Sequence, residues 1–285
     1  MHVRHWVSAA LAVGALAGPA LAAQERESRR SSGSRDATEW LEECEENRRR
    51  HDDDDDDRVR FCEVRESRLR ATGRTLAVDG RQNGGIDVEA WDGDGILLQA
   101  RIQAQAPTME EARQIASGVR IDTAGPTISA SGPATSGRRS WWVGYLLLVP
   151  RRTNLDLSTH NGPIHVQGVT GRMELRAVNG PLALDDVGGD VRGRTQNGPL
   201  AITLGGARWD GAGLDAETRN GPLILELPRK YGARLETGTQ NGPMDIDFPI
   251  TLQGRIGRRI TTTLGAGGPL IRAVTTNGPL VIRER

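Results

Sequence analysis

The sequence predicts an all-β protein folded as a parallel β-solenoid, and three observations support this prediction. The triplet Asn-Gly-Pro recurs through the C-terminal half, and an alternating apolar strand follows each copy. The first three copies lie 18 residues apart, a spacing typical of stacked repeats. Proline has no N–H to close a two-residue hairpin, which favours a chain that turns a corner at each triplet and stacks on the preceding coil. A β-sandwich or an antiparallel meander is the alternative.

The six triplets are the predicted structural turns. Glycine adopts positive φ at no steric cost, asparagine tolerates it, and proline fixes φ at the first position of a strand. We expect the asparagine amides to form a ladder along one corner, and we expect Gly267-Gly268-Pro269 to be a degenerate copy of the turn. The triplets are Asn161, Gly162 and Pro163; Asn179, Gly180 and Pro181; Asn197, Gly198 and Pro199; Asn220, Gly221 and Pro222; Asn241, Gly242 and Pro243; and Asn277, Gly278 and Pro279.

Residues 1–22 have the pattern of a secretion signal. An apolar run from Trp6 to Leu16 follows two basic residues, and Ala20-Leu21-Ala22 is a small-x-small cleavage site. The sequence therefore predicts a mature protein that is exported to the periplasm, the cell surface or the medium, without a transmembrane segment. Residues 23–36 are rich in Ser, Arg and Glu, which predicts a disordered linker.

Residues 37–69 are predicted to form a charged leader of helix and loop. Cys44 and Cys62 are the two cysteines of the chain, and in an exported protein they are expected to form a disulfide, with two free thiols as the alternative. The acidic run Asp52–Asp57 is expected to be a solvated loop; calcium binding is the alternative, although the spaced ligands of a calcium loop are missing.

Residues 70–285 are predicted to be one continuous solenoid domain, whose opening coil contains Asn83-Gly84-Gly85. Thr108 begins a capping box, and Ala112, Ile115 and Ala116 continue an apolar stripe. We expect a short helix there that covers a strand face or the exposed end of the stack, because repeat arrays need caps.

The composition favours no particular chemistry. Basic and acidic residues are balanced at 37 each, which argues against nucleic-acid or anionic-membrane binding. No catalytic motif or cofactor site is predicted from the sequence. No metal site is predicted either, because His160 and His165 lack a third ligand nearby. Two weaker candidate sets are carboxylates for sugar chemistry (Asp185, Asp186, Asp190, Asp210, Asp215, Asp245 and Asp247) and aromatic residues for sugar stacking (Trp91, Trp141, Trp142, Trp209 and Tyr231).

The chain resembles the putative-adhesin family, also called domain of unknown function 4097. The resemblance rests on Asn83-Gly84-Gly85-Ile86, on the strand from Trp142 to Pro150, and on the repeats from Asn161 to Ile282. The segment with Trp40, Cys44, Cys62 and Glu63 is similar to the leader of some exported bacterial members. The resemblance implies a β-strand repeat protein of the bacterial envelope and brings no catalytic residues.

Together these features predict a non-enzymatic exported envelope protein that acts as an adhesin-like binding or scaffold module. Its expected partner is a protein or polysaccharide of the envelope or surface. One alternative is a polysaccharide-active enzyme that uses Asp185 and Asp186; another is a structural protein that self-assembles end to end.

Overall fold

The computed structural model describes residues 37–46, 58–134, 136–247, 249 and 257–285. These residues form two ten-stranded sheets whose inward side chains share one core, so the all-β prediction is confirmed. Two short helices accompany the sheets, at residues 37–46 and at α2 (Met109–Gly118). The predicted signal peptide, the linker and the Asp52–Asp57 run lie outside the described residues.

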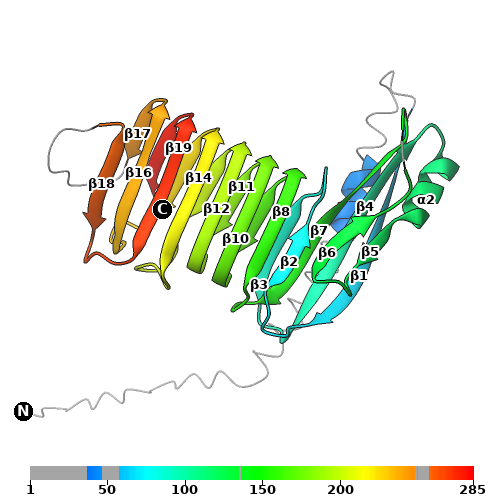
Figure 1. Cartoon of the computed structure of the whole chain (residues 1–285), viewed down its shortest axis with the longest axis horizontal. Helices are drawn as coiled ribbons and strands as arrows, with labels where there is room; N and C mark the ends of the chain where they lie inside the picture. Colours follow the sequence, from blue (N-terminus) through cyan, green and yellow to red (C-terminus); the bar gives the residue numbers. More distant parts are fainter. Residues whose placement is uncertain (1–36, 47–57, 135, 248, 250–256) are drawn as a thin grey trace, which may run out of the picture.

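The strands stand side by side in two elongated rows (Figure 1). In spatial order, sheet A contains β1 (Val59–Arg70), β4 (Gly95–Ala106), β7 (Ser140–Pro150), β3 (Ile86–Trp91), β9 (Ile164–Gln167), β11 (Leu182–Asp185), β13 (Leu200–Thr203), β15 (Leu223–Leu227), β20 (Leu280–Glu284) and β17 (Met244–Asp247). Sheet B contains β18 (Arg259–Leu264), β16 (Ala233–Asn241), β19 (Leu270–Asn277), β14 (Gly213–Asn220), β12 (Gly188–Asn197), β10 (Thr170–Asn179), β8 (Leu155–Asn161), β2 (Leu76–Asp79), β6 (Thr127–Ser131) and β5 (Arg120–Asp122).

Each Asn-Gly-Pro triplet joins a strand of sheet B to a strand of sheet A. The triplet at Asn161, for example, links β8 to β9, and the two strands belong to different sheets, so the triplet does not close a hairpin. Equivalent strands of neighbouring repeats pair in parallel and in register, as Met173 with Val191 and Leu182 with Leu200. Every repeat therefore contributes one strand to each sheet, and we call this pair of strands a rung.

Side chains alternate between the core and the solvent along each rung. Met173 and Leu175 of β10 and Leu182 and Leu184 of β11 are at most 1% exposed. Burying a large apolar side chain stabilises a fold by about 1.5–3 kcal/mol, so the repeated apolar pairs supply most of the driving force for stacking.

The rungs do not stack in sequence order at the C-terminal end. The last rung, β19 and β20, lies between the β14–β15 rung and the β16–β17 rung, and Figure 1 shows the C-terminus within the row of strands. The N-terminal end has the same irregularity, because β2 and β3 lie between β6–β7 and β8–β9. The expectation that every coil stacks on the preceding one is wrong at both ends.

The N-terminal end of sheet A is antiparallel. β1 pairs with β4 and β4 with β7, and β1 lies in the segment for which the sequence suggested helix or loop. The predicted capping helix is present as α2: Thr108 Oγ1 accepts a hydrogen bond from the Glu111 N–H, and α2 packs on β1 and β4. It thus covers a strand face. Arg65 of β1 donates to the carbonyls of Ala116 and Val119 at the C-terminal end of α2.

The C-terminal end has its own cap in sheet B, where β18 pairs antiparallel with β16. The sequence Gly267-Gly268-Pro269 lies between β18 and β19, at the opposite corner from the Asn-Gly-Pro triplets. Both glycines have positive φ, 77° and 154°. The expectation that this segment is a degenerate copy of the repeat turn is therefore wrong.

Candidate functional site

The corner formed by the triplets carries a continuous ladder of side-chain amides. In six hydrogen bonds, the Nδ2 of one asparagine donates to the Oδ1 of its neighbour at 2.8–3.0 Å. The ladder runs in the order Asn83, Asn161, Asn179, Asn197, Asn220, Asn277 and Asn241. The amides are thus bonded to one another along this edge, which favours a structural role for the corner.

The triplet glycines are needed for a different reason from the one expected. None of the six triplets has positive φ at Asn or Gly, so the left-handed turn inferred from the sequence is wrong. Close stacking explains the glycine instead. A Cβ on Gly180 would lie 2.0 Å from the Gly162 oxygen, and a Cβ on Gly198 would lie 2.1 Å from the Gly180 oxygen. A side chain has no room between adjacent corners.

The backbone of each corner bonds to the next corner. Gly180 N–H donates to the Asn197 carbonyl and Leu182 N–H to the Pro199 carbonyl, each at 3.0 Å. The residue between them, Pro181, has no N–H that would need a partner. The Gly180 carbonyl accepts from Thr195 Oγ1 at 2.7 Å. The same threonine contact is made by Thr159, Thr218, Thr239 and Thr275.

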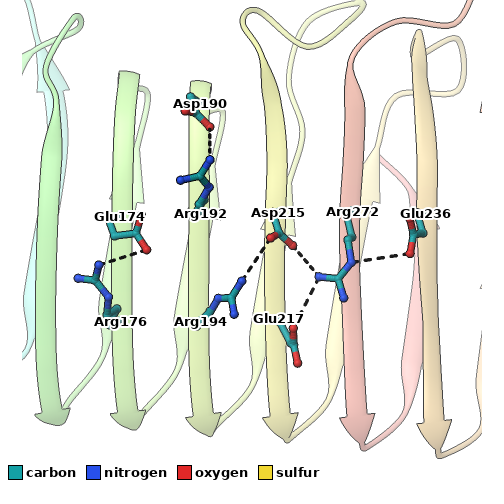
Figure 2. Close-up of polar contacts among 9 residues, drawn as sticks. All are labelled: Glu174, Arg176, Asp190, Arg192, Arg194, Asp215, Glu217, Glu236 and Arg272. Carbon is teal, nitrogen blue, oxygen red and sulfur yellow. Dashed lines mark hydrogen bonds and ion pairs between the residues drawn. The ribbon is translucent and has the colours of Figure 1, made fainter.

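The outer face of sheet B carries a row of alternating charges, which Figure 2 shows together with its neighbours. Glu174, Arg192, Asp215, Arg272 and Glu236 occupy adjacent rungs at one register position. Arg272 Nη1 lies 2.6 Å from Asp215 Oδ1, and its Nε lies 3.7 Å from Glu236 Oε1. Opposite charges face each other across the strands, which stabilises this pairing.

The same row gives a physical reason for the order of the C-terminal rungs. If β16 stacked directly on β14, Asp215 would face Glu236, because both residues pair with Arg272 in the structure. Like charges directly opposite each other are destabilising. Inserting Arg272 between the two carboxylates converts one repulsive contact into two attractive ones.

The candidate carboxylates for sugar chemistry do not converge on one site. Asp190 and Asp215 lie in strands of sheet B, where each has an arginine partner, whereas Asp185 lies in sheet A. Asp186 Oδ1 accepts from Arg285 Nη1 at 2.7 Å. Asp210 is an exposed residue of the connection before β14, and Asp245 and Asp247 are exposed on β17.

Most of the candidate aromatic residues serve the fold. Trp209 is 3% exposed and donates to the Gly189 carbonyl, and Tyr231 is 2% exposed. Burial raises the pKa of Tyr231 to about 12, with a further contribution from the Asp186 charge. Trp91 and Trp141 donate to the Gly95 and Pro133 carbonyls. Of the five, Trp142 alone has an indole N–H without a hydrogen-bond partner in the described part of the chain.

Trp142 lines a groove of about 370 Å³ where the repeats meet the N-terminal strands. We call this site the aromatic groove and define it by Trp40, Asp87, Arg101, Trp142, Asn161 and His165. Trp40 comes from the helix at residues 37–46, and the Arg101 guanidinium lies 5.8 Å from the centroid of its ring. The predicted Cys44–Cys62 disulfide is present and joins that helix to β1.

The pKa of His165, which lines the aromatic groove, is displaced from its ordinary value. Its Nδ1 lies 3.0 Å from Asp87 Oδ1. The hydrogen bond to Asp87 raises the pKa of His165 above its ordinary value, partial burial opposes the shift, and the charges of Asp87, Glu89 and Asp185 add to it. The pair gives the groove an acidic and a basic group in contact.

Within the described ranges, no group of three or more His, Cys, Asp and Glu side chains is arranged to hold a metal ion. No helix among the same residues is both long enough and apolar enough to cross a membrane.

No protein-family model matches the chain. No curated protein is similar to it in sequence. Among solved structures, a putative cell adhesion protein from Clostridium sporogenes aligns with a TM-score of 0.47 at 10% identity, over 79% of this chain and 100% of the other. A putative adhesin from Bacteroides fragilis aligns with a TM-score of 0.33 at 9% identity, over 79% and 97%. A putative lipid binding protein from Parabacteroides distasonis aligns with a TM-score of 0.32 at 7% identity, over 78% and 96%.

The aromatic groove was not predicted from the sequence. From the sequence, Trp40 belongs to the leader, Trp142 to the candidate aromatic residues and to the strand that resembles the family, and His165 is a histidine without a third ligand nearby. The signal that was available is local: Trp40 and Cys44 are four residues apart, so a disulfide at Cys44 positions Trp40 on the same side of a helix.

Proposed function

We propose that this chain is a non-enzymatic exported protein of the bacterial envelope that acts as an adhesin-like binding or scaffold module. We further propose that it is a parallel β-solenoid and a member of the putative-adhesin family. The observation that carries the proposal is the use of the polar repeat residues for stacking. The asparagines bond to one another at the corner, and the charges on sheet B neutralise one another.

The disulfide supports the exported location, because such bonds persist in oxidising compartments such as the periplasm. The signal-like segment at residues 1–22 supports the same proposal. An adhesin-like role fits a long, regular surface with a groove that contains partly exposed aromatic side chains and polar groups.

The proposal is tested by expressing the full chain in a bacterium and separating cytosolic, periplasmic and envelope fractions. We expect a processed chain with an oxidised Cys44–Cys62 pair that co-sediments with the envelope fraction. An unprocessed, reduced chain in the cytosol, or a processed chain that binds no envelope material, would contradict it.

The enzymatic alternative is disfavoured by the dispersal of the carboxylates over two sheets. It predicts reducing-end release from envelope polysaccharides that is lost in Asp185→Ala. We expect no release by the wild-type chain.

End-to-end self-assembly is disfavoured by the form of the free edge. In the described residues β17 pairs on one side only, with β20, and its exposed side chains are Asp245 and Asp247. Short, charged edge strands oppose pairing with another chain. We therefore expect a monomer by light scattering.

A further inference from the structure

We propose that the aromatic groove is a binding site for a short stretch of neutral pyranose saccharide and that the Cys44–Cys62 disulfide holds the site together. This inference rests on the proposed function and gives it a ligand class. It follows from the aromatic side chains of the groove, its polar groups and the attachment of the helix that completes it.

The aromatic content of the groove suits a sugar ring. Trp40 and Trp142 both line it, from segments a hundred residues apart in the chain. Tryptophan combines a broad apolar surface with one N–H donor, so it can cover the C–H face of a pyranose and also hydrogen-bond to a hydroxyl. The indole N–H of Trp142 has no partner among the described residues and is therefore available for this bond.

The polar groups of the groove complement sugar hydroxyls, which both donate and accept hydrogen bonds. Asp87 offers carboxylate oxygens as acceptors, and Asn161 offers the second N–H of its amide, because the ladder bond to Asn83 uses only one. His165 contacts Asp87 and lines the same groove. Arg101 lines the groove as well, and its charge is opposite to that of Asp87, which favours a neutral ligand over a strongly cationic or anionic one.

The size of the groove limits the ligand to a short segment. Its volume of about 370 Å³ lies near the lower end of the range of roughly 300–1,000 Å³ for small-molecule sites. One end of a glycan, or a few units within it, fits this volume better than a long bound polymer does. The groove also lies beside Asn161, at the start of the repeat stack, so a glycan chain can continue along the rod.

The disulfide determines whether Trp40 is in place. Trp40 and Cys44 lie one helical turn apart, and Cys44 is 7% exposed where it is bonded to Cys62 of β1. Isolated helices shorter than about 12–15 residues are marginal in water. The helix at residues 37–46 therefore depends on its attachment, and reduction of the disulfide to two thiols releases the segment that carries Trp40.

Binding is tested by isothermal titration of the mature, oxidised chain with cellohexaose, hexa-N-acetylchitohexaose and maltohexaose. We expect at least one of these neutral saccharides to bind, and we expect Trp142→Ala to weaken that binding by about tenfold or more, as for an aromatic residue at the centre of an interface. Trp142→Phe should retain part of the affinity. Trp91→Phe, which alters a tryptophan outside the groove, is the matched control and should bind like the wild type.

The dependence on the disulfide is tested by repeating the titration in tris(carboxyethyl)phosphine, with circular dichroism to verify that the sheets persist. We expect reduction to weaken binding by about tenfold or more, equivalent to about 1.4 kcal/mol. The double variant Cys44→Ser, Cys62→Ser should bind weakly with or without reductant. Equal binding by the reduced and oxidised chains would overturn the role of the disulfide.

The outcomes separate this inference from the proposed function. If none of the three saccharides binds, or if Trp142→Ala binds as well as the wild type, the saccharide site is overturned. If in either case the chain still co-sediments with the envelope, the proposed function stands without this site. If the chain is not exported, the proposed function fails whatever the titrations show.

Discussion

The Asn277 side-chain amide donates to Asn220 Oδ1 at 2.8 Å, although the two residues are 57 positions apart. Asn241, which precedes Asn277 in the chain, bonds to the far side of Asn277. The last rung therefore separates two rungs that are consecutive in sequence. The order of the ladder follows the charges on sheet B and differs from the order of the chain.

Arg272 is expected to be the most important arginine of the sheet B face. It is 26% exposed and lies near Asp215, Glu217 and Glu236, so its removal leaves three carboxylates close together. Arg272→Met should lower the free energy of unfolding by about 1.5–3 kcal/mol, the range for hydrogen bonds to charged groups. Urea unfolding measures this effect. Arg192→Met is the control, because Arg192 forms a single ion pair among the described residues, with Asp190 at 3.9 Å. An equal loss in both variants would contradict the assignment.

Ala177 is the one exception in the row of corner threonines. Thr195 and its equivalents each donate to a glycine carbonyl of the neighbouring corner, and Ala177 occupies the corresponding position facing Gly162. Ala177→Thr should add this hydrogen bond and raise the stability by about 1 kcal/mol. The reverse change in the next rung, Thr195→Ala, should lower stability by a similar amount. A destabilising Ala177→Thr, measured by urea titration, would show that this rung is packed differently from its neighbours.

The triplet glycines should not tolerate any side chain. Gly198→Ala would place a Cβ 2.1 Å from the Gly180 oxygen, so the corners would have to separate. We expect a loss of about 2 kcal/mol or more in the free energy of unfolding, in the upper range for single substitutions. Gly257→Ala is the control, since no atom of the described residues beyond its two chain neighbours lies closer than 3.9 Å to its Cβ. Thermal or urea unfolding of the two variants should give clearly separated midpoints, and coinciding midpoints would refute the close-stacking argument.

The His165–Asp87 pair should make stability depend on pH. The pKa of His165 is raised in the folded state by its hydrogen bond to Asp87, so the pair stabilises fully below the ordinary histidine pKa of about 6.5. This contribution is lost as the pH rises through the raised pKa. Because the side chain is partly exposed, we expect an effect of at most about 1 kcal/mol.

Comparing the unfolding midpoints of the wild type and His165→Gln across this pH range measures the contribution of the pair. The difference should be largest at low pH and should shrink as the pH rises. His160→Gln, at an exposed position next to the corner, is the control. A difference that grows with pH would contradict the assignment.

The strands and their inward faces were predictable because the information is local. The alternation of Leu182 and Leu184, and the triplet before them, specify a strand with one buried face wherever that strand is placed. The capping box at Thr108 and the pair Cys44 and Cys62 are local or compositional signals in the same way.

The order of the rungs was not predictable from the repeats themselves. The triplets at Asn241 and Asn277 are equivalent, so either asparagine could donate its side-chain amide to Asn220. The alternating charges distinguish the two orders, and they become evident once the register is known. The need for glycine at the corners was also not predictable from local sequence. Turn propensity is a local property, whereas the carbonyl that leaves no room for a Cβ belongs to the neighbouring repeat.

The most direct test of the stacked, in-register architecture is disulfide formation between paired cysteines introduced into the ladder. Neighbouring rungs lie about 4.8 Å apart and alternate rungs about twice that distance, and a disulfide needs a Cα separation below about 7 Å. Asn179→Cys with Asn197→Cys is the positive control. We predict that Asn220→Cys with Asn277→Cys oxidises as readily as the control, whereas Asn220→Cys with Asn241→Cys does not. Efficient oxidation of the 220–241 pair without oxidation of the 220–277 pair would contradict the structure on which the proposed function rests.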